Sequence, residues 1–115
     1  MKHYTEEQKS IIRSIDIAKY TPKAALYEQL AEEASELSQA AIKCARCIRK
    51  ESYTSKTMEE CEQNLIEELS DVKCCADALQ ISHSDEIVKY KTFRWKQRIY
   101  EYSSAYNKLV NRIEV

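Results

Sequence analysis

Acidic side chains recur at the same short spacing in two parts of this chain. Glu33 and Glu36 lie three residues apart, and so do Glu68 and Asp71 further along the sequence. Residues three apart share one face of a helix. Carboxylates beside an apolar core are costly to bury unless a cation or hydrogen-bond donors compensate them. The two pairs therefore predict a metal site built between two helices.

Two long helices, about 21–50 and 57–81, are expected to position these acids, because apolar residues recur in both at helical spacing. The predicted apolar stripes comprise Leu26, Leu30, Ala34, Leu37, Ala41, Cys44 and Ile48 on the first helix, and Met58, Cys61, Leu65, Leu69, Val72, Ala76 and Leu79 on the second. The residues along one flank of these stripes are Gln29, Glu33, Glu36 and Ala40, and Asn64, Glu68, Asp71 and Cys75. If the two helices pack as an antiparallel pair, the two acid pairs meet.

The composition predicts an all-α fold. The 115 residues include no glycine and one proline, so few tight turns or hairpins can form. We expect one helical domain of four to five helices over 1–115, with a core at about 21–102 and a helical tail at about 105–115. A chain of this size has a high surface-to-volume ratio, so packing with a second subunit is expected, as a homodimer or a homotetramer.

Capping signals place the remaining helices. Thr5 and Gln8 form a capping box that begins a first helix, which is expected to fade near 19–20. Ser/Thr-rich sequence at 51–56 predicts a loop. Ser82 or Ser84 is expected to cap the fourth helix, which should weaken after Tyr102.

Net charge and apolar patterning argue against two classes of partner. The net charge of −1 argues against a general nucleic-acid binder. No apolar run is long enough to cross a membrane, and residues 1–7 lack the apolar region of a secretory signal. An odd number of cysteines without a secretory signal predicts reduced thiols and a cytoplasmic location.

Cys44 and Cys47 form a C-x-x-C pattern that is typical of zinc or redox sites. Their neighbours are good helix formers rather than the Gly or Pro of a zinc knuckle. Cys74 and Cys75 have the wrong spacing to supply a second ligand pair. Core packing is therefore the favoured interpretation, with zinc or redox chemistry as the alternative.

An all-carboxylate site favours Mg²⁺, which prefers hard oxygen ligands and keeps several waters. A di-iron bundle would need Glu-x-x-His, and neither His3 nor His83 follows a glutamate at that spacing. The predicted fourth helix places three cations on one face, which would suit a polyphosphate opposite the metal: Lys91, Arg94 and Arg98. Gln29, one turn before Glu33 on the same flank, is a candidate for a hydrogen bond to a base or ribose.

The two acid motifs resemble those of a known family. E-E-x-x-E at 32–36 followed by E-E-L-x-D at 67–71 is similar to the pattern of the MazG-like nucleoside triphosphate pyrophosphohydrolases, in the all-α NTP pyrophosphatase superfamily. The segment 85–94 is similar to the basic helix that follows the second motif. The resemblance covers about 26–98, and the spacer between the motifs is longer than in compact members.

The resemblance implies Mg²⁺-dependent hydrolysis of nucleoside or deoxynucleoside triphosphates to the monophosphate and pyrophosphate, by attack of a metal-activated water on the α-phosphorus. Mn²⁺ is expected to substitute for Mg²⁺. The implied metal ligands are Glu33, Glu36, Glu68 and Asp71. Glu32 and Glu33 are the implied catalytic residues, and Glu32 would orient a ligand, bind a second metal or assist the water. The implied phosphate-binding residues are Lys91, Arg94 and Arg98.

Two other functions remain open from the sequence. One is a non-catalytic helical dimer that senses nucleotides or acts as a scaffold. The other is a nucleic-acid binder that uses the basic fourth helix.

Overall fold

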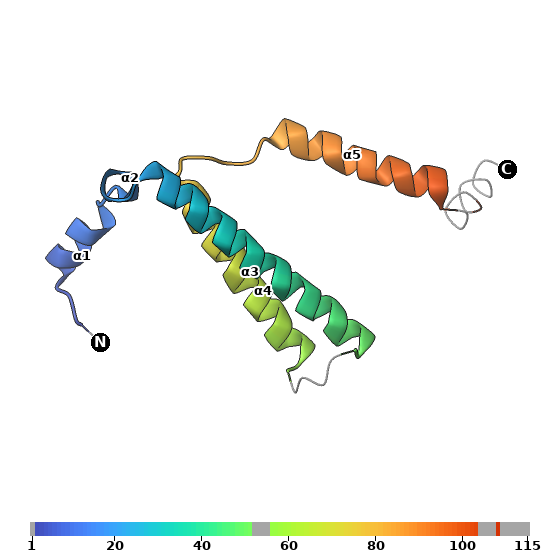
Figure 1. Ribbon diagram of the computed structural model, residues 1–115, viewed down its shortest axis with the longest axis horizontal. Helices are drawn as coiled ribbons and strands as arrows, with labels where there is room; N and C mark the ends of the chain where they lie inside the picture. The colour runs from blue at the N-terminus through green and yellow to red at the C-terminus, as the bar shows by residue number, and fades with distance from the viewer. Residues whose placement is uncertain (1, 52–55, 104–107, 109–115) are drawn as a thin grey trace. The chain divides into compact units, whose positions relative to one another are not determined.

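The structure is a computed structural model of the 115-residue chain, and it describes residues 2–51, 56–103 and 108. All regular secondary structure in these residues is helical, which confirms the all-α prediction (Figure 1). The helices are α1 (Glu6–Arg13), α2 (Ile17–Tyr20), α3 (Lys23–Arg49), α4 (Met58–Ala78) and α5 (Asp85–Tyr102). The chain divides into two units, Met1–Ile81 and Ser82–Val115. Within the described ranges, no helix combines the length and the hydropathy that a membrane span requires.

The first helix is shorter than the sequence predicted. The Thr5 hydroxyl accepts a hydrogen bond from the backbone N–H of Gln8 at 3.1 Å, and the Gln8 side chain accepts one from the Thr5 N–H at 2.9 Å, so the capping box is confirmed. The helix ends at Arg13 instead of continuing to 19–20. Asp16 causes the break, because its carboxylate accepts from the N–H of Ala18 at 3.1 Å and begins α2.

The ends of α3 and α4 follow the expected signals closely. Pro22 is the N-cap of α3 and makes no side-chain capping bond, so the start lies one residue later than the Thr21 cap predicted. Lys50 ends the helix in the left-handed conformation at φ 57°. A capping box between Thr57 and Glu60 begins α4, as predicted. Only Glu51 and Lys56 of the predicted 51–56 loop are among the described residues.

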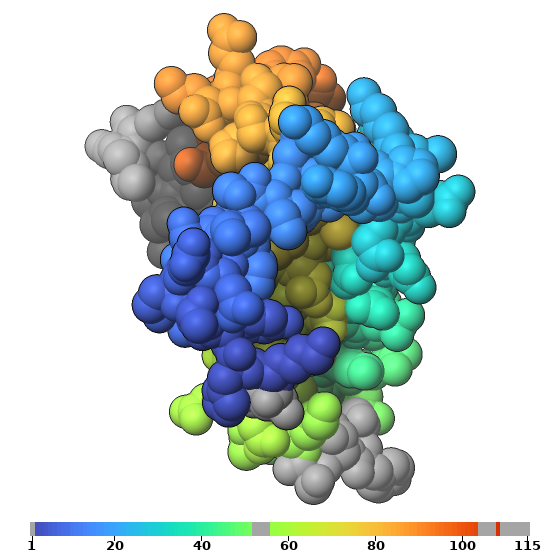
Figure 2. All heavy atoms as spheres, turned by 90° about the vertical axis from the view of Figure 1, so that its left-hand side faces the viewer, coloured from blue at the N-terminus to red at the C-terminus, as the bar shows by residue number. Residues whose placement is uncertain are grey.

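Packing of α3 against α4 forms the core of the first unit. The two helices lie side by side along most of their length, and the side chains of α3 (cyan to green) run next to those of α4 (yellow-green) in Figure 2. The described residues that are buried are Leu26, Ala40, Cys44, Cys61 and Leu79. This core is small, because a pair of helices can bury only a narrow strip of each.

The contact face between the helices combines residues of the predicted stripes and of the predicted flanks. Leu26 and Cys44 of α3 and Cys61 and Leu79 of α4 are buried, as the stripes predicted. Ala34, Ala41 and Ile48 were expected in the α3 stripe, but all three are exposed, and Leu69 of α4 is 56% exposed. The contact face also extends toward the predicted flank of α3, where Ala40 is only 2% exposed. The seam between the two helices therefore includes Ala40 of the flank together with the buried stripe residues.

Ala40 and Ala41 are neighbours that test which side of α3 packs against α4. We expect Ala40→Leu to lower the free energy of unfolding by roughly 1–3 kcal/mol, because a larger side chain at the seam forces the helices apart. Ala41→Leu should change stability by no more than about 0.5 kcal/mol, since that position is exposed. Urea unfolding followed by circular dichroism measures both. Equal destabilisation by the two variants would contradict the observed packing face.

The second unit contains α5. The Ser84 hydroxyl accepts a hydrogen bond from the N–H of Ile87 at 3.3 Å, which selects Ser84 over Ser82 as the N-cap. The helix ends at Tyr102, as the Ser103-Ser104 sequence predicted. It has no buried residue. The predicted tail at 105–115 lies outside the described residues, except for Lys108.

Candidate metal site between α3 and α4

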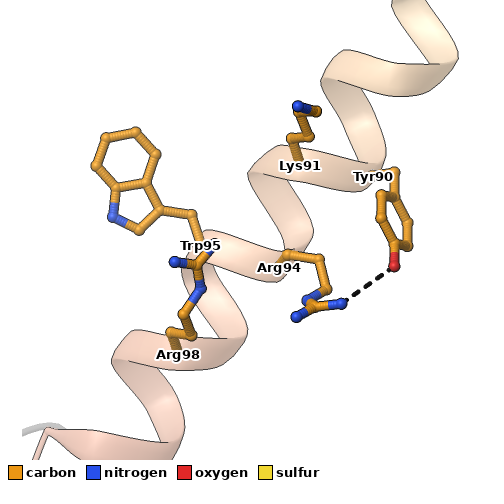
Figure 3. A pocket seen from close by; sticks show the side chains of 5 residues that line it. All are labelled: Tyr90, Lys91, Arg94, Trp95 and Arg98. Atoms are coloured by element: carbon orange, nitrogen blue, oxygen red, sulfur yellow. Dashed lines mark hydrogen bonds between the residues drawn. The ribbon is translucent and has the colours of Figure 1, made fainter.

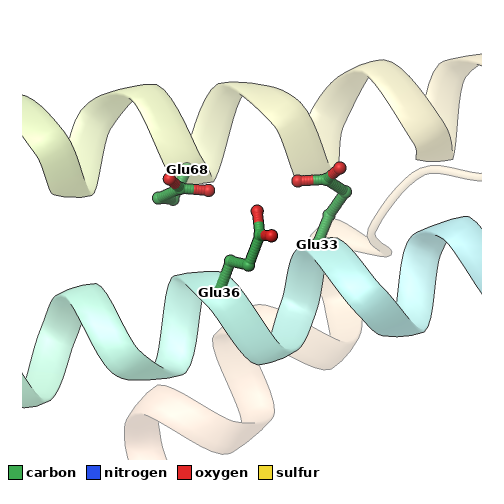
Figure 4. Close-up of side chains that lie close together, drawn as sticks. All are labelled: Glu33, Glu36 and Glu68. Carbon is green, nitrogen blue, oxygen red and sulfur yellow. The ribbon is translucent and has the colours of Figure 1, made fainter.

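Three glutamates from two helices converge in the first unit. Glu33 and Glu36 of α3 and Glu68 of α4 each offer a carboxylate oxygen, and the three oxygens lie within 4.8 Å of one another. Figure 4 shows Glu36 between the other two, with all three carboxylates in the space between the helices. We call these residues the glutamate cluster. Its geometry could hold a divalent cation with oxygen ligands.

The extension of the contact face toward the predicted flanks brings this cluster together. Glu33 and Glu68 lie on the predicted flanks of their helices, and the flanks have become part of the contact face, so both are half-buried. Glu36, one turn further along α3 than Glu33, remains exposed. The cluster is therefore open to water on the side of Glu36 and closed on the side of the helix contact.

Two oxygens of the cluster are buried without a hydrogen-bond partner. They are Oε2 of Glu33 and Oε2 of Glu68. The other oxygen of Glu33, Oε1, accepts a hydrogen bond from Nε2 of Gln29 at 2.8 Å. Buried acceptors without donors are costly and uncommon in folded proteins. Among the described residues no cation forms an ion pair with these acids, so a bound metal ion would satisfy oxygens that the protein itself leaves unsatisfied.

Repulsion between the acids shows in the pKa of Glu36. The neighbouring charge of Glu33 raises this pKa above its ordinary value of 4.5, and the charge of Glu68 raises it further. Desolvation of the Glu36 carboxylate adds to the shift of its pKa. A bound divalent cation would act in the opposite direction, because it favours the ionised carboxylates.

This shift gives a prediction for metal-free protein. Between pH 4.5 and the raised pKa, native Glu36 holds more proton than the unfolded chain does, so stability falls as pH rises through this window. Glu36→Gln should remove that loss of stability. In chelator-treated buffer, the melting temperature of the variant minus that of the wild type should therefore increase from pH 4 to pH 7. Glu28→Gln, at an exposed position of α3, should keep the wild-type profile. Parallel pH profiles for wild type and Glu36→Gln would show that the repulsion does not affect stability.

The structure leaves two predicted acids outside the cluster. Asp71 lies one turn beyond Glu68 on α4 and is exposed, and its carboxylate is not among the three that converge. Glu32 directly precedes Glu33 and is also exposed. A ligand role for Asp71 and a catalytic role for Glu32 stay predictions.

Gln29 has a partner that the sequence analysis did not assign to it. The residue was predicted to contact a base or ribose, and in the structure its amide bonds to Glu33. The spacing of four residues on one helix was the signal for this contact, since Gln and an acid at i and i+4 are neighbours. Gln29 fixes the orientation of the Glu33 carboxylate, while its predicted contact with a nucleotide stays untested.

The predicted phosphate-binding cations lie together on α5. Lys91, Arg94 and Arg98 line one surface hollow of the helix, together with Tyr90 and Trp95 (Figure 3). Nη1 of Arg94 donates a hydrogen bond to the Tyr90 hydroxyl at 3.2 Å, and its guanidinium lies 5.9 Å from the centre of that ring. The second unit therefore offers cations and aromatic rings on one surface, a combination that suits phosphate groups and bases.

Comparison with known proteins finds no match to this chain among protein families, curated proteins or solved structures.

Proposed function

We propose that this protein is a MazG-like nucleoside triphosphate pyrophosphohydrolase of the cytoplasm. It hydrolyses a nucleoside or deoxynucleoside triphosphate to the monophosphate and pyrophosphate, and it requires Mg²⁺. The observation that carries the proposal is the glutamate cluster, in which three carboxylates converge and two buried oxygens lack a donor. The repeated acid motifs and their resemblance to this family supply the reaction.

The donor set of the cluster fits the proposed metal. Mg²⁺ binds hard oxygen ligands, and the cluster offers only carboxylates, with no imidazole or thiol among its three members. Glu33, Glu36 and Glu68 would hold the ion with Asp71 as a fourth acid, and Mn²⁺ would substitute. When bound, the metal would neutralise phosphate charge and lower the pKa of a coordinated water.

The remaining residues have roles that follow from their charge and position. Gln29 holds the Glu33 carboxylate in place through the 2.8 Å hydrogen bond. Glu32 is proposed to act on the attacking water, and its exposure leaves it free to accept a proton. The cations proposed to bind the β- and γ-phosphates are Lys91, Arg94 and Arg98, which lie along one surface of α5.

A second subunit is part of the proposal, as a homodimer or a homotetramer. Large apolar side chains remain exposed on both helices of the first unit, including Ile42 of α3 and Ile66 and Leu69 of α4. Burial of these side chains against a second copy would remove apolar surface from water. Light scattering coupled to gel filtration should give a mass at least twice the 13.5 kDa of one chain.

A pyrophosphate-release screen tests the proposed activity. The purified protein is incubated with canonical and modified NTPs and dNTPs, first with Mg²⁺ and then with a chelator in its place. We expect pyrophosphate from at least one nucleotide with Mg²⁺, none with the chelator, and recovery when Mn²⁺ is added. Mg²⁺-dependent nucleotide binding without pyrophosphate release would instead support the non-catalytic nucleotide-sensing dimer.

Nucleic-acid binding through α5 is a second candidate, and the surface in Figure 3 favours it. The segment from 89 to 98 holds several cations and no acid, and Tyr90 and Trp95 lie beside three of them. Single-stranded nucleic acids bind to such combinations of cations and stacking rings. Salt-dependent binding of an oligonucleotide that is lost in Arg94→Glu, without nucleotide turnover by the wild type, would support this function over hydrolysis.

A further inference from the structure

Three cysteines gather where α3 ends and α4 begins. Cys44 and Cys61 are buried between the two helices, at 8% and 5% exposed, and Cys47 is half-buried beside them. The predicted core packing accounts for the burial of Cys44 and Cys61. It does not account for a partly accessible thiol placed next to a buried one on the facing helix.

Backbone contacts on both helices fix the positions of Cys47 and Cys61. Sγ of Cys47 contacts the carbonyl oxygen of Lys56 at 4.0 Å, and Lys56 directly precedes the N-cap of α4. The N–H of Cys61 donates to the carbonyl of that N-cap, Thr57, at 3.1 Å, which places Cys61 one turn inside the helix. Cys47 of α3 therefore lies against the first turn of α4, at the level of Cys61.

The end of α3 is also held in place. The N–H of Lys50 donates to the carbonyl of Cys47 at 3.3 Å, and the N–H of Glu51 donates to that of Arg46 at 3.0 Å. These bonds are typical of a helix that ends in a left-handed residue. Both cysteines are therefore held by supported backbone, and Cys61 lies close enough to contribute to the raised pKa of the Cys47 thiol.

We propose that Cys47 and Cys61 form an intrachain disulfide when the protein meets a low-molecular-weight disulfide such as oxidised glutathione. The cross-link joins the end of α3 to the start of α4. It is independent of the proposed function, because neither cysteine belongs to the glutamate cluster.

The exchange is balanced in two steps. The Cys47 thiolate attacks one sulfur of oxidised glutathione, forms a mixed disulfide and releases one glutathione thiolate. The Cys61 thiolate then attacks Sγ of Cys47 and releases the second glutathione thiolate. Two protein thiols are oxidised, one external disulfide is reduced, and the two thiol protons pass to the released glutathione molecules.

Accessibility decides which thiol attacks the external disulfide and which thiol then closes the bond within the protein. Cys47 is more accessible than Cys44 or Cys61, so the external disulfide reaches it first. Cys74 and Cys75 are adjacent on one helix and their side chains point in different directions. Burial raises the pKa of the Cys47 thiol, so little thiolate is present at neutral pH and the reaction needs a long incubation.

Peptide mapping identifies the bond in the full-length protein. Trypsin cleaves after Arg46, Arg49 and Lys56, so each of Cys44, Cys47 and Cys61 falls in a different peptide. After incubation with oxidised glutathione and alkylation of the remaining thiols, we expect the peptide 47–49 linked to the peptide 57–73. The melting temperature should rise on the order of 10 °C, since the bond closes a loop of about 15 residues. A reductant should reverse both changes.

Serine variants supply the controls. Cys47→Ser and Cys61→Ser should each lose the linked peptide and the rise in melting temperature, whereas Cys74→Ser should keep both. The proposal is overturned if the wild type keeps free thiols at both positions, carries glutathione on Cys47 without the cross-link, or links Cys44 in place of either residue. The wild-type peptide map decides the question even if Cys61→Ser fails to fold.

Discussion

Replacing Glu33 with glutamine is expected to reduce Mg²⁺-dependent pyrophosphate release by roughly 100-fold or more while leaving the helices folded. Glu33 contributes one of the three converging carboxylates, and its Oε2 is buried without a donor. Glutamine has nearly the same shape and retains an acceptor oxygen for Gln29, so the 2.8 Å hydrogen bond can persist. The variant removes the negative charge that a divalent cation requires.

Glu28→Gln is the matched control for this variant. Glu28 lies on α3, is exposed and is not part of the glutamate cluster, so the same chemical change should leave the rate within about twofold of wild type. Initial rates of pyrophosphate release at saturating Mg²⁺ measure the effect, and far-ultraviolet circular dichroism checks the fold. A Glu33→Gln protein with the wild-type rate would remove the glutamate cluster from the mechanism.

Asp71→Asn is expected to reduce the rate to a similar extent. The family resemblance places this aspartate with the three glutamates as a metal ligand, one turn after Glu68 on α4. The structure leaves Asp71 exposed and outside the cluster. Its charge lies close enough to contribute to the raised pKa of the Cys75 thiol. The loss should be partly recovered at high Mg²⁺, because the three glutamates remain to bind the ion.

Asp77→Asn provides the comparison on the same helix. Asp77 is exposed and forms an ion pair with Lys73 at 2.9 Å, so its replacement should alter activity little. If Asp71→Asn and Asp77→Asn are both fully active, the ligand set consists of the three glutamates alone and the four-acid set implied by the resemblance does not apply to this chain.

Features that depend on a few neighbouring residues could be predicted from the sequence. The capping boxes at Thr5 and Thr57 formed as expected, because each requires only hydrogen bonds across three residues. The ends of α3 and α5, near Lys50 and Ser103, were also predicted closely. Local preferences determine these positions, and no distant part of the chain competes with them.

Features that depend on contacts between helices were predicted less well. Ala40 and Ala41 are adjacent alanines about 100° apart around α3, and the apolar pattern did not distinguish the face that contains each one. The choice depends on how closely α4 can approach, which is a property of the pair of helices. The break at 14–16 was missed for a different reason, since Asp16 was not considered as a cap.

The candidate site also depends partly on spacing within one helix and partly on contacts between helices. The spacing within each motif predicted that acids would share a helix face, and the structure brings Glu33, Glu36 and Glu68 together. The register of the helices decided which acid of the second motif took part. The contact face passes through Glu68, and Asp71, three residues later, lies toward solvent.

The central claim is that water attacks the α-phosphorus of a nucleoside triphosphate in a reaction that depends on the glutamate cluster. Hydrolysis in ¹⁸O-labelled water, with the products followed by ³¹P nuclear magnetic resonance, tests it most directly. The account predicts a nucleoside monophosphate that carries the label and unlabelled pyrophosphate, both formed by the wild type and neither at a comparable rate by Glu33→Gln. Label in the pyrophosphate, formation of diphosphate and orthophosphate, or no hydrolysis of any nucleotide tested would contradict it.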